Sequence, residues 1–277
     1  MPVCVPHSVH DERQRRRVFT AGRRFLTARR RFVDHVATVD GLTATARCAG
    51  DPWSDMTVVL LAGLGLAGNY MLPLGGELAE RCRVWVPMIP GFGWSDRPPE
   101  PLDIPAMGEF VIAWARAVGI ERAVMVGNSM GCQVAVEAAL HAPDIISHLV
   151  LDGPTIDSRA RTVPRLIMRV AVDALREPAS LAAVQAFEWL GTGPRRLAKT
   201  TRFAVAHAIE QRVRAVTCPV LVVRSRNDPF VPQPWAEEIA SSAGDATIRV
   251  IDEGTHALPY SNPHVLAQVT VDFVSHR

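Results

Sequence analysis

The stretch Gly127-Asn128-Ser129-Met130-Gly131 puts a serine between two glycines, a spacing that suits nucleophilic chemistry. An apolar run, Ala123–Val126, precedes it, and residues with helical spacing, Gln133–Leu140, follow it. A serine on a sharp strand-to-helix turn has a strained backbone, and the residues two positions away must lack side chains so that strand and helix pack closely. The start of the helix would also direct backbone N–H groups toward a developing oxyanion. This context favours Ser129 as a nucleophile over a serine that merely occupies a turn.

A serine hydroxyl needs a histidine base and a carboxylate that orients the histidine. Among nine histidines, His256 directly follows the last apolar run, where the end of a strand would present it to a site. The other histidines lie near the termini, in connections or in expected helices, and are better explained as surface or structural residues, although His207 could face a substrate. We therefore expect His256 to be the base.

Two aspartates could supply the carboxylate. Asp228 follows the apolar run Pro219–Arg224 and precedes a proline-rich stretch that would hold its loop stiffly. Asp152 follows the preceding run, at the same expected edge of the sheet as Ser129. The pattern favours Asp228, with Asp152 as the alternative that would otherwise cap a turn or line the pocket.

Short apolar runs alternate with stretches of helical spacing, which is typical of βαβ units whose parallel strands are buried on both faces. The expected strands after an opening hairpin at Asp40-Gly41 are Thr57–Ala62, Val84–Pro87, Ala123–Val126, His148–Asp152, Pro219–Arg224 and Thr247–Ile251. The expected helices between them are Met71–Glu80, Ile104–Val118, Met130–His141 and Pro234–Ala243. The sequence thus predicts an α/β fold with a mostly parallel sheet of eight strands.

The interval between Asp152 and Cys218 breaks this alternation, because it contains no convincing strand. Its expected helices are Val163–Leu175, Ser180–Trp189 and Arg195–Gln211. A helical insertion in a regular α/β chain is typical of a lid over a site. We therefore expect a basic arm at residues 1–33, a core at 34–153 and 217–277, and a helical lid at 154–216.

The order Ser129, Asp228, His256, with a lid after the sixth strand, resembles the α/β-hydrolase-fold serine hydrolases over about residues 34–277. The stretch Leu60–Gly65 resembles the loop after that family's third strand, and Pro90–Pro98 resembles the loop after its fourth. Asn262-Pro263 would open the last helix, as it often does in that family. Members of this superfamily include esterases, lactonases and carbon–carbon bond hydrolases. The resemblance implies that the backbone N–H groups of Leu64 and Met130 form the oxyanion hole.

The sequence departs from the resemblance at Ala62-Gly63, where relatives commonly carry His-Gly. The hydrogen bonds of that histidine must therefore come from elsewhere. "GNSMG" resembles the carbon–carbon bond hydrolases, but no clear counterpart of their substrate-carboxylate arginine is present; the candidates are Arg165, Arg169, Arg195 and Arg196.

Residues 11–31 carry nine arginines and a net charge of +7, while the rest of the chain has a net charge of about −5. This arm is typical of a solvated helix with Phe19, Phe25, Leu26 and Phe32 turned toward the body; a transit peptide or a nucleic-acid- or membrane-binding arm is the alternative. We expect no nucleic-acid partner. The sequence has no candidate transmembrane segment or export signal, and its five scattered cysteines lack CxxC spacing, so we expect a cytoplasmic protein without a zinc site.

We expect no cofactor, because Gly63–Gly68 matches G-x-G-x-x-G but no ribose-binding acid follows at the right distance. The expected partner is a small-molecule substrate, a largely apolar carboxylic ester or lactone cleaved through an acyl-enzyme. Carbon–carbon bond hydrolysis of a diketone-like substrate, or a non-hydrolytic role as cyclase or ligand receptor, is the alternative. Residues that could line its pocket are Asn128, Trp189, Phe187 and Met168.

Overall fold

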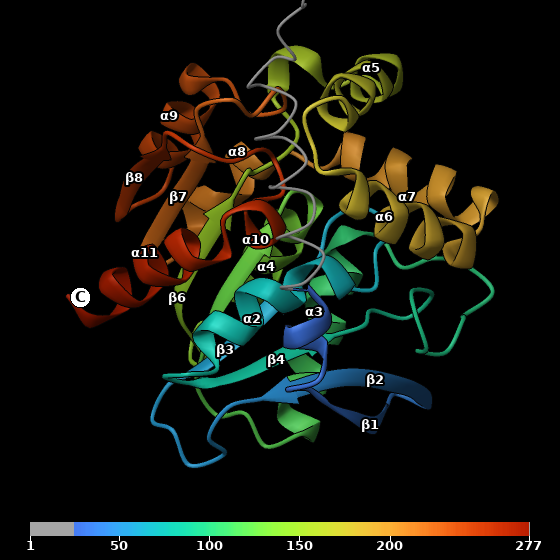
Figure 1. The fold of residues 1–277 in the computed structure, drawn as a ribbon, viewed down its shortest axis with the longest axis vertical. Helices are drawn as coiled ribbons and strands as arrows, with labels where there is room; N and C mark the ends of the chain where they lie inside the picture. Colours follow the sequence, from blue (N-terminus) through green and yellow to red (C-terminus); the bar gives the residue numbers. More distant parts are fainter. Residues whose placement is uncertain (1–24, 277) are drawn as a thin grey trace, which may run out of the picture.

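The computed structural model describes residues 25–276, which form one eight-stranded sheet with helices on both faces (Figure 1). The strand order is β1-β2-β4-β3-β5-β6-β7-β8. β1 and β2 pair antiparallel, β2 pairs antiparallel with β4, and every later pair is parallel. The strands are β1 (Val33–Val39), β2 (Leu42–Ala49), β3 (Thr57–Leu61), β4 (Arg83–Pro87), β5 (Ala123–Asn128), β6 (Ile146–Asp152), β7 (Val220–Ser225) and β8 (Ala246–Ile251). The predicted fold class is confirmed.

The opening hairpin turns at Asp40 and Gly41, whose φ angles are 50° and 76°. Positive φ at both central residues is the geometry of the tight turn that matches the twist of two antiparallel strands. The register from Val33↔Cys48 to Val39↔Leu42 confirms the hairpin that Asp40-Gly41 predicts.

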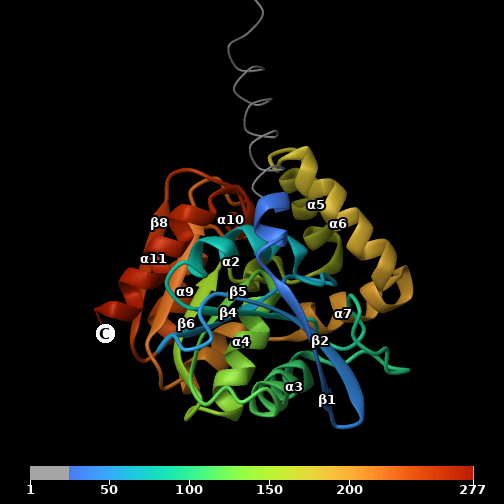
Figure 2. The ribbon, with the colours of Figure 1, turned by 60° about the horizontal axis from the view of Figure 1, so that its bottom comes forward.

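Alternate residues of the central strands pack into two separate hydrophobic cores. In β3, Val59 and Leu61 pack with one core, and Val58 and Leu60 pack with the other. Figures 1 and 2 show the helices on the two sides of the sheet. One core takes residues from α3 (Ile104–Ala117), α4 (Met130–His141), α8 (Ile209–Arg212) and α9 (Gln233–Ser242). The other takes residues from η1 (Asn69–Met71), α2 (Leu72–Leu78), α10 (Leu258–Ser261) and α11 (Pro263–Ser275).

β8 differs from the expectation that each strand is buried on both faces. Only Ile251 at its end is buried, and Arg249 and Val250 are exposed. β8 lies at the edge of the sheet and pairs only with β7, so fewer helices cover it.

A helical insertion, residues 154–216, connects β6 to β7, and its helices other than α8 lie beyond one end of the sheet (Figure 1). It contains η2 (Ser158–Ala160), α5 (Val163–Ala174), α6 (Ala179–Thr192), α7 (Pro194–Ala206), α8 and η3 (Val213–Ala215). The single helix expected over Arg195–Gln211 is instead two, because the chain is extended at His207, whose ring is held by the core residue Glu137.

The arm is described only from Phe25, and most of its arginines and Phe19 lie outside the described residues. Residues 25–29 are helical. Phe32 is buried and Phe25 lies half-buried, 6.3 Å from the ring of Tyr260 between centroids. Leu26 is 63% exposed, contrary to the expectation, because the next residue of a helix points to a different side. In residues 25–276, no helix combines the length and apolar character needed to cross a bilayer.

Glu137 joins α4 to the insertion. Its carboxylate is fully buried, and its Oε1 lies 2.7 Å from His207 Nε2. Arg212 donates to both carboxylate oxygens, at 2.7 Å each. Burial alone would raise the pKa of Glu137, but the hydrogen bonds and charges of His207 and Arg212 outweigh it and lower the pKa from 4.5 to about 2.

We predict that Glu137→Ala lowers the free energy of unfolding by about 2 kcal/mol, because the buried ring of His207 loses its hydrogen-bond partner and Arg212 loses both of its hydrogen bonds to α4. The exposed Glu109→Ala on α3 is the control and should change it by less than about 0.5 kcal/mol. The lowered pKa means that the contribution of Glu137 is complete above 4.5 and is lost as the pH falls toward about 2. Urea unfolding at neutral and acidic pH measures both effects. Equal losses in the two variants would contradict the prediction.

Candidate active site

Ser129 occupies the turn between β5 and α4 with φ 60° and ψ −122°. A Cβ added to Gly127 would lie 2.4 Å from the carbonyl oxygen of Gly131, and one added to Gly131 would lie 2.2 Å from the carbonyl oxygen of Leu61. Both contacts are too short for any side chain, which is the steric requirement that the sequence pattern predicts. The N–H of Ser129 donates to the carbonyl of Asp152 at 3.0 Å and holds the turn against β6.

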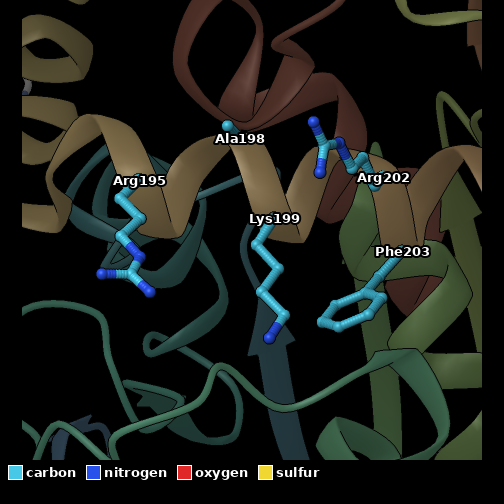
Figure 3. Close-up of a pocket in the computed structure, with 5 residues that line it drawn as sticks. All are labelled: Arg195, Ala198, Lys199, Arg202 and Phe203. Carbon is cyan, nitrogen blue, oxygen red and sulfur yellow. The ribbon is translucent and has the colours of Figure 1, made fainter.

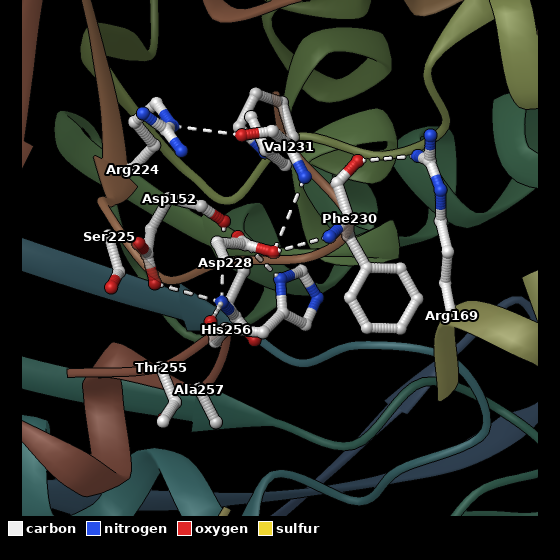
Figure 4. Close-up of polar contacts among 12 residues, drawn as sticks. Asp152, Arg169, Arg224, Ser225, Asp228, Phe230, Val231, Thr255, His256 and Ala257 are labelled. Carbon is white, nitrogen blue, oxygen red and sulfur yellow. Dashed lines mark hydrogen bonds and ion pairs between the residues drawn. The ribbon is translucent and has the colours of Figure 1, made fainter. Parts of the chain in front are cut away.

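Asp228 and His256 meet at the same edge of the sheet (Figure 4). Asp228 lies between β7 and α9, and His256 lies between β8 and α10. The Nδ1 of His256 is 2.8 Å from Oδ2 of Asp228. The other oxygen, Oδ1, accepts the backbone N–H groups of Phe230 at 2.7 Å and Val231 at 3.3 Å. The loop after β7 therefore holds the carboxylate of Asp228 in place, and this carboxylate in turn orients the imidazole of His256.

The electrostatics around His256 favour its protonated form. Burial acts to lower the pKa of the imidazole, but the charge and hydrogen bond of Asp228, with the charges of Asp173 and Asp152, raise it to about 9. The second nitrogen, Nε2, is buried and has no hydrogen-bond partner within residues 25–276. The structure thus brings Asp228 to His256 but shows no hydrogen bond between Nε2 and Ser129.

The alternative acid, Asp152, contacts a different partner. It is fully buried, and its Oδ2 accepts the side-chain amide of Asn128 at 2.8 Å. That amide also donates to the backbone carbonyl of His256 at 3.0 Å, and the Asn128 Oδ1 accepts the hydroxyl of Tyr70 at 2.8 Å. Burial raises the pKa of Asp152 well above its ordinary value. The side chain of Asn128, expected in the substrate pocket, is thus hydrogen-bonded to Asp152, to the loop of His256 and to Tyr70.

Tyr70 supplies a hydrogen bond in the loop where the sequence lacks the expected histidine. Its hydroxyl accepts the N–H of Gly63 at 2.8 Å. A Cβ added to Gly63 would lie 3.3 Å from Cβ of Ser129, so this loop lies directly against the turn. Leu64 sits in a turn closed by a 3.2 Å bond from the N–H of Leu66 to Gly63, and Met130 is the first residue of α4, whose N–H has no partner one turn earlier. Both expected oxyanion donors therefore belong to segments next to Ser129.

The insertion is bonded to the same loop. Glu188 of α6 accepts the backbone N–H groups of Ala67 at 2.9 Å and Asn69 at 3.1 Å. The indole of Trp189 donates to the carbonyl of Leu64 at 2.8 Å. Sequence reasoning placed Trp189 near the site as an apolar residue but missed its hydrogen bond, and it missed Glu188 and Tyr70 altogether. None of the three has a local pattern that marks it.

Two other residues expected in an apolar pocket lie at the surface. Phe187 is 70% exposed and Met168 is 60% exposed, so neither is packed into a buried lining.

A cavity of about 470 Å³ runs along α7, and none of the predicted catalytic residues lines it (Figure 3). Of the candidate arginines, Arg195 lines this cavity, while Arg169 donates to the carbonyl of Phe230 at 2.7 Å and to Asp157 at 3.0 Å. Arg196 donates to the carbonyl of Pro98 at 2.6 Å. The lining residues are Arg195, Ala198, Lys199, Arg202 and Phe203.

Comparison with known proteins agrees with this architecture. The sequence model of the alpha/beta hydrolase family matches residues 58–269. The "Putative carbamate hydrolase RutD" of Caulobacter sp. (strain K31) is 28% identical over 86% of this chain and 97% of its own length. A thermophilic esterase from Thermogutta terrifontis superposes with a TM-score of 0.74 at 20% identity, covering 88% of this chain and 98% of that one. The enol-lactonase from Burkholderia xenovorans LB400 superposes with a TM-score of 0.72 at 22% identity, covering 87% of this chain and 100% of that one.

We predict that Tyr70→Phe slows the reaction of Ser129 with a fluorophosphonate by roughly 10-fold, because the N–H of Gly63 loses its acceptor and the loop of Leu64, the expected oxyanion donor, loses its fixed geometry. Tyr260→Phe is the matched control, since it also removes the hydroxyl of a buried tyrosine, but in α10. Labelling rates followed by mass spectrometry make the comparison. Similar slowing in both variants would show that the effect does not arise at the loop.

Proposed function

Because this chain belongs to the alpha/beta hydrolase family, we propose that it is a serine hydrolase that cleaves a small, largely apolar carboxylic ester or lactone. The observation that carries the proposal is the 2.8 Å contact between His256 and Asp228 at the sheet edge where Ser129 occupies a strained turn. The esterase and the enol-lactonase that share the fold support the choice of an acyl compound.

In the proposed mechanism, Ser129 Oγ attacks the carbonyl carbon while His256 Nε2 takes its proton. His256 then gives that proton to the leaving group, which breaks the bond to the acyl carbon and leaves an acyl-enzyme. Water, deprotonated by His256, releases the acid. Asp228 holds the imidazole and stabilises its charged form, and the N–H groups of Leu64 and Met130 bind the oxyanion. Catalytic hydrogen bonds are often long in the absence of substrate, so Ser129 Oγ meets Nε2 as the substrate complex forms.

The insertion, residues 154–216, acts in this proposal as the lid over the core formed by 34–153 and 217–277. Its support is the pair of α6 residues, Glu188 and Trp189, that bond the loop of the expected oxyanion donor Leu64.

A carbamate is the second candidate substrate, because curated relatives that share over 90% of their length with this chain are named as putative carbamate hydrolases. Attack on a carbamate carbonyl uses the same nucleophile, base and oxyanion donors. A carbon–carbon bond hydrolase also occurs among the structural neighbours, so diketones complete the panel of substrates.

We predict that Ser129→Ala abolishes both fluorophosphonate labelling and hydrolysis of a panel of esters, lactones, carbamates and diketones. Asp228→Asn should lower kcat by about 10⁴-fold, because it removes the charge that fixes and stabilises the imidazole. Asp152→Asn is the matched control, because it makes the same replacement in an acid that bonds Asn128 and not the imidazole, and the loss should stay below roughly 10-fold. Wild-type protein that is folded but unlabelled at Ser129 would refute the proposed function.

We also predict that kcat/KM rises with pH through the alkaline range. The base must be neutral to accept a proton, and the pKa of His256 is raised to about 9, so most molecules are inactive at neutral pH and become active as the pH approaches that value. Initial rates on a hydrolysed substrate between about pH 6 and 10, at constant ionic strength, measure the profile. A limb that rises fully below neutral pH would contradict the electrostatics described for His256.

A further inference from the structure

Glu177 of the insertion bridges the residues on either side of His256. It lies one turn beyond the end of α5 and is partly buried. Its Oε1 accepts the backbone N–H of Ala257 at 2.9 Å, and its Oε2 accepts the hydroxyl of Thr255 at 2.7 Å. Figure 4 shows Thr255 and Ala257 flanking His256 beside Asp228. One carboxylate from the insertion therefore holds the backbone that carries the imidazole.

Asp173 lies on the same turn and faces the same loop. The N–H of Glu177 donates to the carbonyl of Asp173 at 3.0 Å, which keeps the two acids together. Asp173 is 8% exposed, and its charge acts to raise the pKa of His256. The insertion thus places two acids at the loop of His256.

We propose that Glu177 is a positioning residue for His256, and that it makes the direction of Nε2 depend on the seating of the insertion. This rests on the proposed function, since it takes His256 as the base. Asp228 fixes the ring from the core through Nδ1, and Asn128 fixes the backbone carbonyl of His256. Neither contacts Thr255 or Ala257. The carbonyl of Ala257 accepts the N–H groups of Tyr260 and Ser261 of α10, and Glu177 holds the N–H of Ala257 and the hydroxyl of Thr255.

The charges around the loop support this role and provide a readout. Burial and the charge of Asp173 raise the pKa of Glu177 to about 7, and burial raises the pKa of Asp173 to about 6. The other charged groups that act on these acids or on His256 are Asp228 and Asp152 from the core and Arg176 beside Asp173. Carboxylates so near the imidazole favour its protonated form, so removing one should shift the rising limb of the pH profile to lower pH.

A merely structural role is the competing explanation, in which Glu177 only attaches the insertion to the core. Glu238 of α9 offers a matched control, because it also pairs with the insertion, at 3.0 Å from Arg159, but does not touch the His256 loop. Both variants remove one carboxylate between the insertion and the core.

The test uses the full chain with Glu177→Ala, Glu177→Gln, Thr255→Val and Glu238→Ala. Glu177→Ala should slow fluorophosphonate labelling of Ser129, and kcat on any hydrolysed substrate, by about 10- to 100-fold with little change in KM. Glu177→Gln should restore the labelling rate and kcat to within about 3-fold of wild type, because its amide oxygen accepts from Ala257 while its amide nitrogen donates to Thr255. The rising limb of its pH profile should move to lower pH, because the carboxylate charge is gone. The labelling rate of Thr255→Val should lie between those of Glu177→Ala and Glu177→Gln. Glu238→Ala should be labelled at the wild-type rate.

The proton on His256 Nδ1 gives a second measurement that does not depend on Ser129. Its downfield NMR resonance should broaden or disappear in Glu177→Ala and persist in Glu238→Ala, because a loosened ring exchanges this proton faster. If Ser129 is unlabelled in the wild type while the resonance responds in this way, the proposed function fails and the positioning role stands. Two results would overturn the positioning role. One is that the wild type is labelled at Ser129 while the Nδ1 resonance of Glu177→Ala is unchanged. The other is that Glu177→Ala and Glu238→Ala slow labelling equally. If Glu177→Ala does not fold, Thr255→Val carries the same comparison.

Discussion

The close approach of α4 to the end of β3 is the constraint on which the candidate site depends. Gly131 lies so near the carbonyl of Leu61 that an added Cβ would be 2.2 Å from its oxygen. This approach forces Ser129 into a positive φ, a conformation that costs free energy for a residue with a side chain. The bond from the Ser129 N–H to Asp152 helps to hold it there. The same approach places the start of α4 next to the loop of Gly63.

The second constraint is that Asn128 has a fixed set of partners. Its amide donates to Asp152 and to the carbonyl of His256, and its oxygen accepts the hydroxyl of Tyr70. The residue before Ser129 thus connects, through Tyr70, the loop of Gly63 to the loop of His256. Burial raises the pKa of Asp152 well above its ordinary value, and its Oδ2 accepts from Asn128 and not from the imidazole, so its contacts are those of a structural acceptor.

The sequence predicted what depends on local pattern. Apolar runs and glycine spacing located the strands and the turn of Ser129, because burial on both faces and close packing restrict residue type at those positions. The choice between Asp228 and Asp152 was harder, since both follow strands at the same edge and only the course of each loop decides which one reaches His256. Tyr70, Glu177 and Glu188 could not be found, because their partners lie distant in the sequence or in loops without periodicity; Glu188 meets Asn69 across 119 residues.

The insertion holds both loops of the candidate site with buried carboxylates, and this links its attachment to pH. Glu188 bonds the loop of Leu64, and Glu177 bonds the loop of His256. Burial raises the pKa of both acids, so each ionises more readily when the insertion leaves the core. The attachment is therefore strongest at pH values below the ordinary pKa of a glutamate and weakens as the pH rises toward the raised value, about 7 for Glu177.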